Sequence, residues 1–164
     1  MTSKIGFIYT LEHLDKTGQL ISSETIENII PIVGLDYMLG AAFKGTSQFT
    51  AFYLGLFGTN YAPLTADTMT TFIAACGELS SYGEAARAAI TFPGISSSAI
   101  TTSASPNEFD FAAGETIRGA FISSSPTLDG TAGLLVSAVL FPSPKVLSAG
   151  DTLRVPVGFS LASV

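Results

Sequence analysis

Few residues in this sequence could catalyse a reaction. His13 is the single histidine and Cys76 the single cysteine among 164 residues. A Ser–His–acid triad or a Cys–His pair needs an imidazole as its base, so either would have to use His13. His13 lies beside a predicted turn, and we expect it to be a surface residue. Glu78 lies two residues after Cys76, and its negative charge disfavours a reactive thiolate. We therefore expect Cys76 to be a small buried side chain.

Carboxylates offer the next possibility, because calcium needs only oxygen ligands and two carboxylates can form an acid/base pair. The candidates are Glu108, Asp110, Asp129 and Asp151. The sequence has no D-x-D-x-D-G loop, and Glu108 and Asp110 alternate with phenylalanines, which is typical of a solvated strand face. One Cys and one His are too few for a zinc site built from these residues. We therefore expect no catalytic residue, no metal and no cofactor.

Two weaker patterns point to ligands. The stretch GAAFKGTS at 40–47 has the composition of a phosphate loop. A true phosphate loop has the order GK[ST] and opens a helix, whereas this stretch has the order KGT and closes a predicted helix. Tyr53, Tyr61 and Tyr82 could line a sugar site, but the chain has no tryptophan and tyrosines beside turns are more often found at the rim of a core.

The amino-acid composition limits which kinds of partner the protein is expected to bind. Only 12% of the residues are charged, against about 25% in typical soluble domains, and the net charge is −6. The basic residues are scattered singly, which argues against nucleic-acid binding. The longest apolar run, 132–141, is about half a membrane span, and the N-terminal segment does not have the pattern of a secretory signal. Such a composition suits either dense packing against other proteins or a β domain with small polar residues outside.

The first 45 residues predict a hairpin followed by a helix. Two strand-like segments flank DKTG at 15–18, whose Asp and Gly are typical of turns. Residues 31–45 have helical spacing, with Pro31 suited to the first turn and Gly45 to the end. The apolar face of this helix is expected to comprise Leu35, Met38, Leu39, Ala42 and Phe43.

The remainder predicts short strands with turns between them. The run at 49–57 has apolar residues on both alternating sets of positions, as in a strand covered on both faces, although a buried helix also fits. A short helix is possible at 73–82. In 107–123 the alternation predicts a hairpin with Phe109 opposite Gly119 and a structural ion pair between Asp110 and Arg118. The final strand contains Pro156, which requires an edge or a bulge.

These elements predict a mainly β protein. The expected fold is an antiparallel β-sandwich or jelly roll with an N-terminal hairpin and one or two short helices. We expect residues 1–45 to form a hairpin-plus-helix unit that could serve as an arm, and residues 46–164 to form the β-sandwich body. The interface to a partner is expected at Ile29, Ile30, Ile32, Val33 and Tyr37.

Five stretches carry a resemblance to a known family, and in order they cover most of residues 28–155. They are NIIPIVGLDYMLGAAFKG, FYLGLFGTNYAPLTADTM, ELSSYGEAARAAITFPG, SSAITTSASPNEFDFAAGETIRGAFISSS and GTAGLLVSAVLFPSPKVLSAGDTLRV. The chain thereby resembles small virion structural proteins of tailed bacteriophages, of the head decoration or cement kind.

The resemblance implies a non-enzymatic protein, made in the bacterial host cytoplasm, that binds and stabilises the capsid shell from its surface. Its partners would be the major capsid protein and further copies of itself, as a dimer or trimer, without nucleic acid or membrane. The alternative is a tail fibre or tail-tip module that binds a glycan of the host surface. The family's members supply no catalytic residues to carry over.

Overall fold

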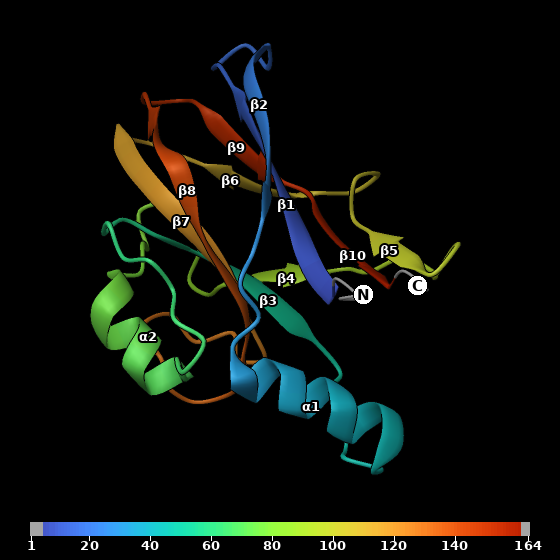
Figure 1. Ribbon diagram of the computed structural model, residues 1–164. Helices are drawn as coiled ribbons and strands as arrows, with labels where there is room; N and C mark the ends of the chain where they lie inside the picture. Colours follow the sequence, from blue (N-terminus) through green and yellow to red (C-terminus); the bar gives the residue numbers. More distant parts are fainter. Residues whose placement is uncertain (1–4, 162–164) are drawn as a thin grey trace.

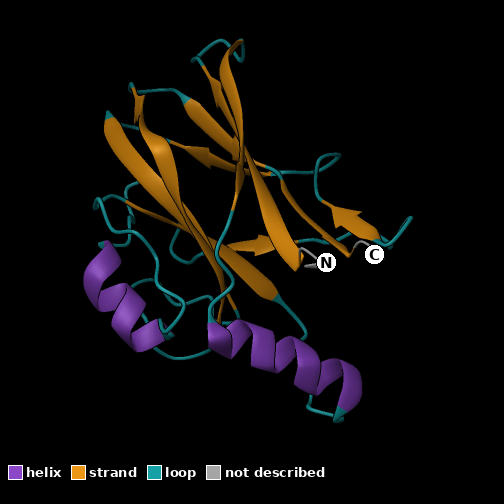
Figure 2. Cartoon of the chain, in the orientation of Figure 1, coloured by secondary structure: helices purple, strands orange, loops and turns teal. Residues whose placement is uncertain are grey.

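The computed structural model describes residues 5–161 and shows two antiparallel sheets and two helices (Figure 1; Figure 2). Strands account for 43% of the chain and helices for 13%. Side chains from both sheets share one core, so the described chain is a β-sandwich. The predicted mainly β, antiparallel fold is therefore confirmed, whereas the jelly-roll alternative is not established by the strand orders.

The larger sheet has the order β5-β10-β1-β9-β6, with β2 also paired to β1. Its strands are β1 (Ile5–Leu14), β2 (Leu20–Glu27), β5 (Ala99–Thr101), β6 (Asn107–Asp110), β9 (Thr152–Val155) and β10 (Val157–Leu161). The smaller sheet has the order β4-β3-β7-β8, with β3 (Phe52–Phe57), β4 (Ala88–Ile90), β7 (Glu115–Ser123) and β8 (Leu135–Leu147). The helices are α1 (Ile32–Phe43) and α2 (Met69–Cys76).

Strand β1 lies inside the larger sheet. It pairs with β10 near its start and with β9 near its end, and Pro156 falls at the break between those two strands. The predicted hairpin to β2 is confirmed, and the Gly18 N–H donates to the Asp15 carbonyl across its turn at 2.8 Å. Tyr9 and Leu11 of β1 are fully buried in the core. Residues 5–45 are thus not a separate arm, and the division at residue 45 does not match a structural boundary.

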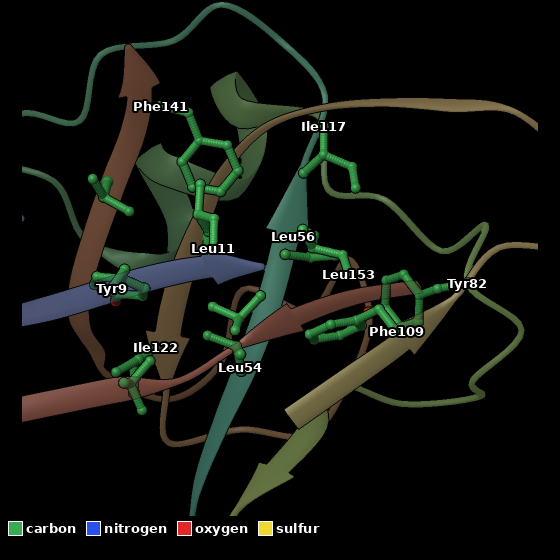
Figure 3. Packing of buried hydrophobic residues seen from close by; sticks show 14 of the residues in the cluster. Tyr9, Leu11, Leu54, Leu56, Tyr82, Phe109, Ile117, Ile122, Phe141 and Leu153 are labelled. Atoms are coloured by element: carbon green, nitrogen blue, oxygen red, sulfur yellow. The ribbon is translucent and has the colours of Figure 1, made fainter. Parts of the chain in front are cut away.

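The core lies between the two sheets. Figure 3 shows Tyr9 and Leu11 of β1 pointing toward side chains of the smaller sheet, among them Leu54 and Ile122. Alternate residues are buried along most of β1 and in β9, which is the geometry that sequence alternation predicts. Burial of this apolar surface stabilises the fold by roughly 25 cal/mol per Å².

The hairpin predicted for 107–123 is wrong. β6 pairs with β9 of the larger sheet, and β7 pairs with β3 and β8 of the smaller one. Asp110 and Arg118 therefore lie on different sheets, and Asp110 instead accepts a hydrogen bond from the Thr152 hydroxyl at 2.6 Å. The alternation identifies which side chains face the core, but two facing sheets satisfy it as well as two paired strands do.

Aromatic rings cover two glycines in the smaller sheet. Gly55 lies opposite Phe121, and Phe57 lies opposite Gly119. A Cβ on Gly119 would lie 2.0 Å from Phe57 Cζ and 2.4 Å from the Val139 carbonyl oxygen. The ring that covers Gly119 thus comes from Phe57 and not, as predicted, from Phe109. The glycines let large rings fill the layer beneath α2.

Helix α1 forms where predicted, but of its predicted apolar face only Met38 packs against the core. Gly34 lies against β8, where a Cβ would be 2.6 Å from the Val136 carbonyl oxygen. Because α1 approaches β8 through Gly34, the side chains of Leu35, Leu39 and Phe43 are exposed to solvent. Gly45 has a φ of 68° just after the helix, which fits the predicted glycine at the helix end.

We expect Gly119→Ala to destabilise the protein by about 1–3 kcal/mol, because neither the Val139 backbone nor the packed Phe57 ring can move freely. Gly158→Ala is the matched control, since its Cβ would meet only ordinary contacts at 3.7 Å. Urea unfolding of both variants measures the difference. Equal stabilities for the two variants would contradict the packing described for Gly119.

Candidate functional site

His13 has a structural partner. Its Nε2 lies 2.9 Å from Asp151 Oδ2, and the two side chains are only 11% and 9% exposed. The surface histidine expected from the sequence is therefore largely buried. The Ser148 N–H also donates to Asp151, and it lowers the pKa of that carboxyl more than His13 does. No hydroxyl or thiol of residues 5–161 is hydrogen-bonded to the other ring nitrogen, so a triad is not assembled here.

Cys76 lies at the end of α2 and is fully buried among Phe57, Phe72 and Phe121. Burial raises the pKa of its thiol to about 12, with Glu78 adding to the effect. The thiol therefore stays protonated at neutral pH, as expected for a packing residue and not for a nucleophile.

The strongest electrostatic contact is a buried pair, Arg87 with Glu78. Arg87 Nε lies 2.6 Å from Glu78 Oε1, and neither side chain is exposed. The second nitrogen, Nη2, donates to Glu78 Oε2 at 2.7 Å, so the carboxylate is held by both arms of the guanidinium. Such a bidentate pair fixes both side chains in one geometry.

The remaining Arg87 donors are also paired. Nη1 donates to the Ser125 carbonyl at 3.0 Å and lies 3.4 Å from the Ser123 hydroxyl, and Nη2 donates to the Gly130 carbonyl at 3.1 Å. The guanidinium lies over the Phe121 ring at 5.1 Å. The pair therefore joins the segment after α2, the end of β7 and the 124–133 loop. It has no free donor to offer a substrate.

The sequence pattern did not identify Arg87 as a candidate functional residue. The signal that could have identified it is a lone cation inside the otherwise apolar run 85–90. Glu78 was weighed only as a neighbour of Cys76. Its carboxylate also accepts from the Asp129 N–H at 2.7 Å and holds that residue at a φ of 54°.

Two of the other candidate acids, Glu108 and Asp110, bond side chains of β9. Glu108 bonds Arg154 of β9, and Lys145 of β8 donates to Glu24 at 2.7 Å. Within residues 5–161, no three His, Cys, Asp or Glu residues come together in a way that could hold a metal ion. Both described helices are too short and insufficiently apolar to cross a membrane.

A second buried polar group connects the two sheets. The Tyr9 hydroxyl lies 2.7 Å from the Ser137 hydroxyl of β8, which also accepts from the Asn28 side chain. Asn28 Oδ1 accepts from the Phe7 N–H at 2.8 Å. Burial raises the pKa of Tyr9 above its ordinary value. These groups satisfy one another inside the sandwich and therefore serve packing.

The tyrosines considered for sugar binding are mostly committed to the fold. Tyr82 is buried against Phe109 (Figure 3), and its hydroxyl has no hydrogen-bond partner in the described chain. The Tyr61 hydroxyl donates to the Asp67 carboxylate at 3.0 Å. Tyr53 is half-buried in β3. Tyr61 and Tyr82 pack in different hydrophobic clusters.

The most distinctive surface feature is an apolar groove of about 860 Å³ between α1 and the ends of β1 and β10. Its floor includes Phe52, Phe92 and Ile122, which belong to the core or pack against it. Among the described residues that line it, none is charged. We define this hollow as the α1 groove.

The predicted interface residues divide into two groups. Ile29 forms a β-bridge with Ala138, and Ile30 and Val33 pack against the hydrophobic clusters. Tyr37 lines the α1 groove, where its hydroxyl accepts from the Phe49 N–H at 2.8 Å. Ile32 is exposed. The structure thus leaves Ile32 and Tyr37 at the surface and directs the other three inward.

Comparison with protein-family models, curated proteins and solved structures finds no match.

We expect Arg87→Met to lower the free energy of unfolding by about 3–5 kcal/mol, because Glu78 would remain as a buried, uncompensated charge. Arg154→Met is the matched control. Its ion pair with Glu108 is partly exposed, so the expected loss is at most about 1 kcal/mol. Chemical denaturation of the two variants measures both values. A similar small loss in both would show that the buried pair does not organise the loops around it.

Proposed function

We propose that this chain is a non-enzymatic structural protein of a tailed bacteriophage virion, and specifically a decoration or cement protein on the capsid surface. The observation that carries the proposal is the α1 groove, which is large and apolar and has no charged side chain among the lining residues that the structure describes. The centres of protein interfaces are depleted in charge in the same way. Contiguous exposed apolar surface is often found at sites of protein–protein interaction.

The chemistry-bearing residues support the same proposal. His13, Cys76, Glu78 and Arg87 each have a structural role inside the described sandwich. A catalytic site needs a nucleophile, a base and an open position for substrate brought together, and residues 5–161 do not assemble these. The resemblance of residues 28–155 to phage virion proteins then favours the capsid, with the major capsid protein as partner. No observation on the tyrosines favours the tail-tip glycan alternative.

The proposal predicts that the protein is an abundant virion component. Quantitative mass spectrometry of purified virions should give a copy number comparable to that of the major capsid protein. Virions from a deletion strain, purified in the same way, provide the background. A ratio of a few per cent would contradict shell decoration and favour a tail or vertex position. Absence from virions would overturn both structural functions.

A further inference from the structure

We propose that the exposed face of α1 binds the same face of a second copy of this chain, with the two α1 helices antiparallel across a twofold axis. This self-association goes beyond the proposed virion role and does not depend on it. It concerns a defined stripe on α1 together with the α1 groove beside it.

The stripe consists of Ile32, Leu35, Leu39 and Phe43. Their spacing of three and four residues puts them on one side of the helix. All four are exposed, and Phe43 reaches 82% of its accessible surface. A surface helix normally turns such a stripe toward its own core. Here Gly34 occupies the side facing β8, so the stripe has no partner within the described chain.

The α1 groove continues this stripe. Leu35, Leu39 and Phe43 form one of its walls. The opposite wall contains Ile5, Ile95 and Leu161, which are also exposed. One face of the molecule therefore carries both projecting apolar side chains and a hollow that accepts them. A twofold interface requires this self-complementarity, because the same patch serves both partners.

Charge favours a second copy as the occupant. Two copies of a chain with net charge −6 repel each other least where the contact surface itself is neutral. The lining residues of the groove that lie within 5–161 meet this condition. The nearest charges on α1 and its cap are Asp36 and Lys44, which are both exposed and have no ion pair with another described residue.

These two charges determine the orientation. When Leu39 meets Leu39 of the second copy in an antiparallel pair, Lys44 of one helix lies about two residues, or roughly 3 Å of helix rise, from the level of Asp36 of the other. In a parallel pair the same charges would be about 12 Å apart along the axis, and the two Asp36 carboxylates would share one level. Charge complementarity therefore exists only in the antiparallel arrangement.

Sedimentation equilibrium of the full chain, across a concentration series, tests the interface. The expected result is a monomer–dimer equilibrium that Leu39→Asp weakens by roughly a hundredfold, because the charge enters the seam from both copies. Leu20→Asp is the matched control, since Leu20 is 58% exposed and Leu39 is 57% exposed, and it should leave the dimer unchanged. Circular dichroism confirms the fold of each variant. A monomeric wild type, a trimer, or a dimer unaffected by Leu39→Asp would overturn the proposal.

The orientation has its own test in the same experiment. Asp36→Lys should weaken the dimer, as should Lys44→Asp, because each puts like charges together. The double variant, with both charges exchanged, should recover most of the wild-type affinity. Additive losses in the double variant would overturn the antiparallel arrangement.

Discussion

The ion pair between Arg87 and Glu78 is the constraint on which one half of the sandwich depends. A buried guanidinium is tolerated only when its charge and its donors are satisfied, and here the five N–H groups reach Glu78, Ser123, Ser125 and Gly130. These partners come from three segments of chain. They can all be satisfied only when the segment after α2, the end of β7 and the following loop are in place together.

Glycine provides the complementary constraint in the sheets. Gly55 and Gly119 make room for Phe121 and Phe57, and Gly34 lets α1 approach β8. The last of these has a consequence for function. Because the small residue takes the buried position, the large apolar residues of α1 point outward and form a wall of the α1 groove. The same packing that completes the fold therefore creates the surface proposed for assembly.

The sequence predicted features that depend on local chemistry. The Asp15–Gly18 turn, the helix from Ile32 and the inward positions of Phe109, Phe111 and Ile117 were all available from residue types and spacing. The strand that pairs with each strand could not be predicted, because the alternation is the same for strands that pair within one sheet and strands that face each other across the core. The predicted contact between Asp110 and Arg118 is wrong for that reason. The outward face of α1 was also inaccessible, since it depends on a backbone contact between Gly34 and Val136. Likewise, nothing local pairs Arg87 with Glu78, nine residues away.

The surface of α1 is the one proposed for self-association, whereas His13, Cys76, Glu78 and Arg87 serve the interior. Disulfide cross-linking of Leu39→Cys under mild oxidation tests this self-association most directly. The native thiol, Cys76, is buried and stays out of the reaction. In the antiparallel pair residue 39 meets its own counterpart, while Ile32 lies about 20 Å of helix rise from its own. For the proposed antiparallel pair we expect a covalent dimer of Leu39→Cys and no covalent dimer of Ile32→Cys. Cross-linking of both variants, or of neither, would contradict it.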